Sequence, residues 1–134
     1  MTYEQLSVGD SASMEKTISE SDVYTFADVT GDFNPVHLSK THAEQSLFGE
    51  RIAHGMLVGS LFSSVMAMQM PGPGGIYISQ SLEFVAPVKF GDTVTATVTI
   101  KEKMEKRRVR LACSAVNQRG KVVVQGEAVV LPAK

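Results

Sequence analysis

The chain has 134 residues, a length at which about two-thirds of the unfolded surface can be buried in one core. Hydrophobic residues make up 43% and charged residues 20%, which excludes disordered, collagen-like and disulfide-rich proteins. Thirteen basic residues against fourteen acidic ones give a formal charge of −1, without the basic excess typical of a nucleic-acid-binding protein. We therefore expect one domain, residues 1–134, that binds no nucleic acid.

The few cysteine and histidine residues limit the redox and metal chemistry that is expected. Cys113 is the only cysteine, so neither an intrachain disulfide nor a cysteine zinc cluster can form. A lone thiol fits a reducing compartment, and the first residues lack the pattern of a secretory signal, so we expect a cytoplasmic protein. The three histidines, His37, His42 and His54, lack the spacing of zinc enzymes, so no metal is expected.

The first 47 residues predict one strand, two helices and a loop. Ser19 and Asp22 form a capping-box pattern, which is a sequence signature of a helix start. Because Pro35 disfavours helical backbone at Asn34, the segment that follows Gly31 predicts a loop. The elements expected here are a short strand (7–18), a helix (19–31), a loop (32–37) and a short helix capped by Ser39 (39–47).

The next segment is strongly apolar. No Lys, Arg, Asp or Glu occurs between Arg51 and Glu83, as in a membrane span. Residues 52–70, however, are only marginally long enough for a span of about 20 residues, and they contain several glycines and polar side chains. The Pro-Gly-rich segment 71–75 follows directly. We therefore expect a helix over residues 55–68 that is buried on every side in the core, with small residues that approach the sheet.

After residue 75 the hydrophobic period changes from 3.6 to 2. In residues 93–100 every second residue is Thr, which is the pattern of a half-buried strand. The strands expected from such alternation cover residues 76–84, 94–100, 109–115 and 122–131, with a turn at 117–120. Four strands in a meander and one apolar helix predict an α+β fold in which a curled antiparallel sheet wraps around the helix. The free edge of this sheet would pair in a dimer.

The segment from Gly31 to His37 has the most chemical character. Asp32 and His37 lie five residues apart on a loop stiffened by proline, so both side chains can reach one space. Two proton-transfer groups with different resting charges suit the addition or removal of water. An Asx turn at Asp32 with a hydrogen-bonded core histidine explains the same residues, and spacing alone leaves both interpretations open.

Gly55 stands at the start of the predicted apolar helix. Its backbone N–H would be an unpaired donor at the positive end of the helix dipole. Such a donor suits a carbonyl oxygen that gains negative charge during a reaction. The structural alternative is that Gly55 allows a tight helix entry while His54 packs or caps.

These residues together resemble the MaoC-like (R)-specific enoyl-CoA hydratases, a group of hot-dog-fold proteins. The segment from Phe26 to Ala43 follows the signature of the group without departure, and Asp-x-Asn-Pro-x-His at 32–37 is its most specific part. Residues 52–57 and 87–94 also look like the family, so the resemblance spans nearly the whole chain. It is strongest to the short, single-domain hydratases that supply (R)-3-hydroxyacyl-CoA to polyhydroxyalkanoate synthesis.

The resemblance implies a homodimer that hydrates trans-2-enoyl-CoA reversibly, without metal or organic cofactor. In that reading Asp32 and His37 hold and activate the water that adds to C3, and one of them returns a proton to C2. The Gly55 N–H binds the thioester oxygen, and Asn34 supports the loop at the substrate site.

Three further residues are substrate-binding candidates by the same resemblance. Ser63 matches a serine of the family motif, and Met66 and Val130 are expected near the acyl tail. Three alternative functions stay open: a dehydratase acting on acyl-carrier-protein thioesters, a hot-dog acyl thioesterase, and a non-catalytic acyl-binding subunit.

Overall fold

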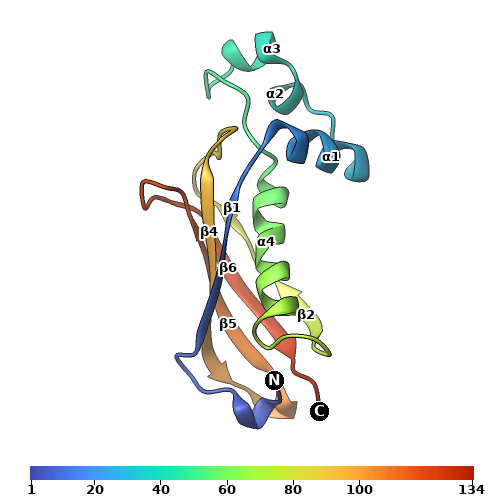
Figure 1. Ribbon diagram of the computed structural model, residues 1–134, viewed down its shortest axis with the longest axis vertical. Coiled ribbons are helices and arrows are strands. Elements are labelled where there is room, and N and C mark those ends of the chain that lie inside the picture. The colour runs from blue at the N-terminus through green and yellow to red at the C-terminus, as the bar shows by residue number, and fades with distance from the viewer.

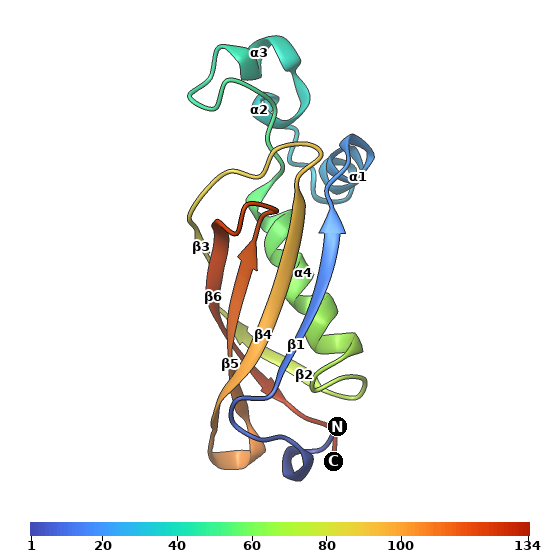
Figure 2. The same ribbon diagram turned by 60° about the vertical axis from the view of Figure 1, so that its left-hand side comes forward.

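The computed structural model describes residues 1–134. A curved antiparallel sheet holds one long helix against its face, and three short helices gather at one end of the molecule, opposite the chain termini (Figures 1 and 2). No helix has both the length and the apolar character needed to cross a membrane. The elements are η1 (Tyr3–Gln5), β1 (Ser11–Thr17), α1 (Glu20–Thr30), α2 (Pro35–Leu38), α3 (Lys40–Glu44), α4 (Gly55–Met68), β2 (Ile76–Gln80), β3 (Glu83–Phe84), β4 (Thr93–Lys103), η2 (Glu105–Arg107), β5 (Val109–Val116) and β6 (Val122–Leu131).

The sheet has the strand order β1-β4-β5-β6-β2, with the short strand β3 also paired to β6. All of these pairings are antiparallel. The expected meander is confirmed for β4, β5 and β6. It is wrong for the strand before them, because β2 pairs with β6 at one edge of the sheet and is not a neighbour of β4.

The core lies between the sheet and α4. In β4, Val94 and Ile100 point inward and are almost fully buried, as the alternation with threonine predicts. From α4, Phe62 and Val65 are completely buried. Each such side chain contributes on the order of 1.5–3 kcal/mol through burial, so the helix is fixed firmly on the sheet.

One face of α4 is exposed, which corrects the expectation of a helix buried on every side. Met56, Ser60, Ser63 and Ala67 are exposed, and their spacing of four, three and four residues puts them on one stripe of the helix. The serines therefore do not approach the sheet. A stripe of small and apolar residues is left uncovered in the single chain.

Two glycines of α4 do lie close to the polypeptide that follows β2. A Cβ atom on Gly55 would lie 2.5 Å from Cδ1 of Phe84, and one on Gly59 would lie 2.8 Å from Cδ1 of Leu82. The absence of side chains at these two positions lets the segment around β3 pass over the start of α4.

The single strand expected over residues 76–84 is two strands, β2 and β3. Of its alternate apolar residues, Ile76 is 56% exposed and Phe84 is 54% exposed, so neither faces the core, whereas Leu82 packs against it. Between the two strands, Ser81 bonds to Glu127 of β6 through its N–H. The alternation therefore predicts strand structure correctly, and it is wrong about the surface that Ile76 and Phe84 cover.

The loop expected over residues 32–37 ends earlier. Pro35 begins the one-turn helix α2, and the Asn34 side chain caps it by accepting a hydrogen bond from the Val36 N–H at 3.2 Å. Proline is well suited to the first helical position, where no N–H is needed. The other early elements are shorter than expected: the first strand begins at Ser11, and α3 ends at Glu44.

Replacement of Gly126 tests how closely the chain crosses β6. A Cβ atom at Gly126 would lie 1.8 Å from the backbone oxygen of Ser81. We expect Gly126→Ala to lower the free energy of unfolding by about 1–3 kcal/mol, because overpacking destabilises a protein by this amount. Urea denaturation measures the change. Gln125→Ala, at the exposed residue next to Gly126, should change the free energy of unfolding by less than about 0.5 kcal/mol. Equal values for the two variants would contradict the close crossing.

Candidate active site

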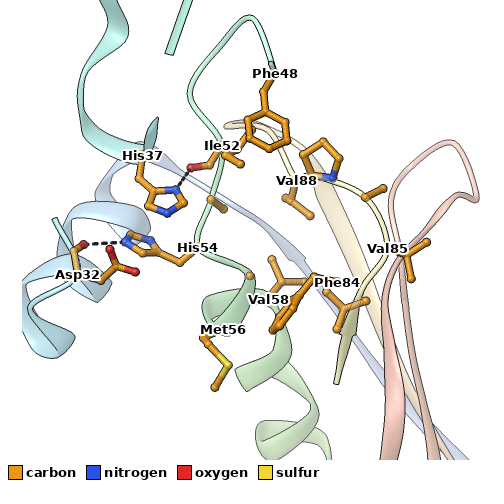
Figure 3. A pocket seen from close by; sticks show the side chains of 15 residues that line it. Asp32, His37, Phe48, Ile52, His54, Met56, Val58, Phe84, Val85 and Val88 are labelled. Atoms are coloured by element: carbon orange, nitrogen blue, oxygen red, sulfur yellow. Dashed lines mark hydrogen bonds between the residues drawn. The ribbon is translucent and has the colours of Figure 1, made fainter. Parts of the chain in front are cut away.

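A pocket of about 400 Å³ lies at the N-terminal end of α4. Ten of its fifteen lining residues are hydrophobic, and they come from the segment before α4, the start of α4, residues 84–88 and β6. The polar groups among the lining residues include Asp32, His37 and His54, which lie together on one side of the pocket (Figure 3). An apolar cavity with a few convergent polar groups is the usual form of a small-molecule site.

A left-handed glycine and an Asx turn position Asp32. Gly31 ends α1 with a φ of 80°, a conformation that glycine adopts without strain. The chain then turns, and the Asn34 N–H donates to Oδ1 of Asp32 at 3.1 Å. The structural alternative from the sequence is therefore present, and it coexists with a place in the pocket, because the turn holds the Asp32 carboxylate at the pocket wall.

His37 is 8% exposed and lies on α2. Its Nδ1 lies 2.7 Å from the carbonyl oxygen of Ile52. A carbonyl only accepts, so Nδ1 carries the hydrogen and Nε2 keeps a lone pair. Burial lowers the pKa of His37, and the nearby His54 ring lowers it further, against the opposing effects of the Ile52 carbonyl and of Asp32. His37 is thus a neutral proton acceptor near pH 7.

His54 is the part of this cluster that sequence reasoning missed. Its ring is stacked on His37 with centroids 3.9 Å apart, and its Nε2 lies 2.9 Å from the backbone oxygen of Asp32. Its side chain makes no capping hydrogen bond to α4. Only its position beside Gly55 distinguishes it in the sequence, and a stack on His37 is a tertiary contact that no local pattern predicts.

The three side chains are close enough to act on one small molecule. A carboxylate oxygen of Asp32 and a ring nitrogen from each of His37 and His54 all lie within 4.8 Å of one another. All three side chains line the pocket. Nε2 of His54 is used at the Asp32 carbonyl and its Nδ1 is buried, which leaves Asp32 and His37 as the groups that can reach a bound molecule. Two protein groups are fewer than the three that hold a catalytic zinc ion, whereas two proton acceptors suit the binding of one water molecule.

Gly55 is the first residue of α4 and lines the same pocket. Its N–H has no acceptor within the protein, as expected for the first turn of a helix. The positive end of the helix dipole adds to the attraction of this N–H for negative charge. The pocket therefore combines two proton acceptors with a backbone donor suited to an oxyanion.

The four remaining candidates lie elsewhere. Asn34 is exposed and does not line the pocket; its role is to shape the loop and cap α2. Ser63, Met66 and Val130 line a second cavity of about 60 Å³, together with Tyr77. Within one chain the structure thus brings these three together, and it does not bring them to the pocket of the proton acceptors.

The wall formed by residues 84–88 was also not predicted as part of a site. It is attached to the start of α4 by the Ala53 N–H, which donates to the Val88 oxygen at 2.7 Å, and by an isolated bridge between Ile52 and Lys89. The resemblance of residues 87–94 to the family was the one sequence signal that drew attention to this region.

Comparisons of the sequence and of the structure with known proteins identify the same family of relatives. A family model described as "MaoC like domain" matches residues 7–123. An (R)-specific enoyl-CoA hydratase from Rhodospirillum rubrum is 47% identical over 133 residues, covering 98% of this chain and 92% of that protein. The structure of R-hydratase PhaJ1 from Pseudomonas aeruginosa superposes with a TM-score of 0.94 at 47% identity, covering 99% of this chain and 86% of that one.

The (R)-hydratase from A. caviae superposes with a TM-score of 0.93 at 41% identity, covering 96% of this chain and 98% of that one. These neighbours have the hot-dog fold, which confirms the α+β architecture expected from the sequence. The family model covers most of the chain, and the relatives match it almost from end to end. The chain therefore belongs to the MaoC-like family of hot-dog-fold proteins.

Proposed function

We propose that this protein is an (R)-specific enoyl-CoA hydratase, a hydro-lyase that adds water to trans-2-enoyl-CoA and gives (3R)-3-hydroxyacyl-CoA reversibly. One observation carries the proposal: the Asp32 carboxylate, the neutral His37 ring and the unpaired Gly55 N–H line a single apolar pocket. The name of the R. rubrum relative at 47% identity supports it.

Asp32 and His37 act as the catalytic pair. Together they hold one water against C3 of the bound enoyl thioester, with the lone pair of His37 Nε2 and the Asp32 carboxylate as acceptors. As the water oxygen bonds to C3, a water proton passes to one of the pair, and a proton returns to C2 on the same face. One hydrogen and one hydroxyl are thus added across the double bond.

The Gly55 N–H acts on the thioester oxygen, which gains negative charge during the reaction. When oxygen bonds to C3, the electrons of the double bond move toward the thioester, and its oxygen becomes enolate-like. A fixed backbone donor at the start of α4 stabilises that oxygen in the transition state more than in the ground state, and this difference is what accelerates a reaction. Asn34 contributes through the loop that carries Asp32.

The uncovered stripe of α4 favours a homodimer. Met56, Ser60, Ser63 and Ala67 are spaced symmetrically along the helix, so an antiparallel copy sets Met56 opposite Ala67 of the partner subunit and Ser60 opposite Ser63 of the partner subunit. The small serines at the centre allow close approach. The edge strand β2, which is mostly exposed, adjoins this stripe and extends the self-complementary surface.

Such a dimer gives the second cavity a role in binding the acyl tail. Gly55 and Met66 are about 16 Å apart along α4 at 1.5 Å per residue, too far for a short acyl chain in one subunit. Met56 lines the first pocket and Ala67 the second, so the antiparallel arrangement brings the partner's second cavity beside the catalytic pair. Ser63, Met66 and Val130 then bound the tail of the substrate bound at the neighbouring site.

The proposed pathway is supported by the proposed reaction and by the description of one relative. The solved A. caviae hydratase is described as involved in PHA biosynthesis, and we propose the same link between fatty-acid β-oxidation and polyhydroxyalkanoate monomers here. The lone cysteine, Cys113, is consistent with a cytoplasmic location.

Removal of either proton acceptor tests the function. Asp32→Asn keeps the shape without accepting a proton, and His37→Gln cannot titrate near pH 7. We expect each variant to hydrate its best enoyl-CoA about a hundredfold more slowly or worse, and the double variant to be little worse than the poorer single one, because the two groups hold one water. Losses that multiply would assign the residues to independent tasks.

The same assay separates the alternatives. Loss of the conjugated enone of crotonyl-CoA without free thiol, followed by chiral analysis of the product, identifies an (R)-hydratase. Thiol release identifies a thioesterase, and no reaction leaves a binding subunit. A chain-length series, run on CoA and on carrier-protein thioesters, gives the tail preference and distinguishes a carrier-protein dehydratase.

Paired substitutions at Gly55 isolate its N–H. Gly55→Ala and Gly55→Pro both add a Cβ against the movable ring of Phe84, and only proline removes the donor. His54 has a ψ of 132°, which is compatible with a following proline. We expect kcat of Gly55→Pro to be about a hundredfold to a thousandfold below that of Gly55→Ala, as measured with folded protein. Equal rates for the two variants would contradict the assignment of the Gly55 N–H as the oxyanion donor.

A charge on the α4 stripe tests the dimer. Ser60 is exposed in the single chain, so Ser60→Asp should leave the protomer folded while placing two like charges near the symmetry axis. We expect light scattering to give the mass of a dimer for the wild type and a shift toward monomer for the variant, with activity lost in parallel. Thr25→Asp, on the exposed side of α1, is the control and should remain an active dimer.

A further inference from the structure

His54 is a buried titratable side chain that the proposed reaction does not use. It is 2% exposed, and it lies between two rings: that of His37, 3.9 Å away and stacked, and that of Phe26 from α1, 4.9 Å away and tilted. Its Nδ1 is the one buried side-chain nitrogen or oxygen atom without a hydrogen-bond partner. A buried polar atom left unpaired is unfavourable, so packing alone is a poor explanation for histidine at this position.

The hydrogen bonds assign a protonation site to each ring. The Asp32 carbonyl, 2.9 Å from Nε2 of His54, accepts only, so His54 carries its hydrogen on Nε2 and leaves Nδ1 unprotonated. His37 has the opposite arrangement, with its hydrogen on Nδ1 toward the Ile52 carbonyl at 2.7 Å. Two stacked imidazoles of opposite tautomer result, and the assignment follows from the acceptors alone.

We propose that His54 is the positioning residue of this active site. Its Nε2–H donates to the backbone oxygen of Asp32, and its ring fixes the plane of the His37 imidazole. Both proton acceptors are thereby kept at a fixed position relative to the first N–H of α4. This inference rests on the proposed hydration, since it assigns a role within that reaction.

The place of His54 in the chain explains why one side chain can do this. It is the residue directly before Gly55, at the start of a helix whose inner side, from Val58 to Met66, is buried in the core. Asp32 lies on an exposed loop and His37 on a helix of one turn, and neither element is rigid by itself. Contact with His54 connects both to α4, and catalytic groups require such support because small misplacements reduce rates strongly.

His54 also affects the proton affinity of His37. The titratable groups that face His37 are His54, from the start of α4, and Asp32, from the loop; α1 contributes only the Phe26 ring to the stack. Burial and the neighbouring imidazole both lower the pKa of His37, because two stacked rings resist carrying two positive charges. The acid limb of kcat/KM for the wild type is therefore expected below pH 6.5, the ordinary value of histidine being about 6.5.

The first test needs no variant and no substrate. Long-range ¹H–¹⁵N spectra of the imidazoles in the wild-type protein report which nitrogen carries the hydrogen. We expect His54 protonated at Nε2 and His37 at Nδ1 near pH 7. A hydrogen on Nδ1 of His54 would overturn the proposal, because Nε2 would then have none to donate to Asp32.

The second test separates the hydrogen bond from the ring. His54→Phe keeps an aromatic stack and removes the donor, and His54→Gln places an N–H at the same number of bonds from Cβ. We expect His54→Phe to lower kcat by about tenfold to a hundredfold, as loss of a supporting hydrogen bond does at other sites, with little change in KM. His54→Gln should recover most of kcat.

Both variants remove the second imidazole, so both should move the acid limb of the pH profile to higher pH, while His42→Gln should change nothing. Wild-type kcat and an unmoved limb in His54→Phe would overturn the proposal, as would a His54→Gln protein no faster than His54→Phe. If the wild type hydrates no enoyl-CoA, the proposed function fails, and the spectra of the wild type still decide whether His54 holds Asp32 and His37 as stated.

Discussion

Helix α4 contains no charged residue, and Phe62 and Val65 on its inner side are completely buried against the sheet. Moving this helix would expose several large apolar side chains at once, each at a cost of order 1.5–3 kcal/mol. Burial of this inner side therefore fixes the helix, and with it the position of its N-terminus beside the pocket. The groups proposed for chemistry are all placed relative to that point: Gly55 directly, and Asp32 and His37 through contacts with His54 and the segment that enters the helix.

The same burial that stabilises the fold adjusts the chemistry. His37 is buried, and the resulting desolvation is the main reason for its lowered pKa. A base must be unprotonated at working pH, so a buried histidine is ready to accept a proton where an exposed one would be partly charged. Its Nδ1 is used by the Ile52 carbonyl, which leaves one defined nitrogen for the reaction.

Local patterns in the sequence predicted much of this structure and failed where tertiary contacts decide. Threonine alternation located β4. The family signature that contains Asp32 and His37 pointed to a segment whose side chains line the pocket, because both signals lie within short stretches of sequence. Alternation over residues 76–84 could not predict that β2 pairs with β6 at the sheet edge and leaves Ile76 exposed, since pairing is non-local. The stack of His54 on His37 joins residues 17 positions apart and has no sequence signature.

The uncovered face of α4 lies beside the second cavity, so the surface proposed for the dimer and the site proposed for the acyl tail adjoin each other. An apolar helix in a chain of this size can be covered on one side by its own sheet, and the stripe from Met56 to Ala67 is left uncovered.

The second cavity, at Ser63 and Met66, opens beside that stripe. In the proposed dimer, a symmetric partner that covers the stripe also sets this cavity beside the neighbouring catalytic pocket. The surface that would stabilise the dimer and the wall that would limit the acyl chain are then built from the same residues. Changes along this face would then alter tail preference and assembly together, whereas Asp32, His37 and Gly55 lie at the end of the helix and are free to keep one chemistry while the tail pocket varies.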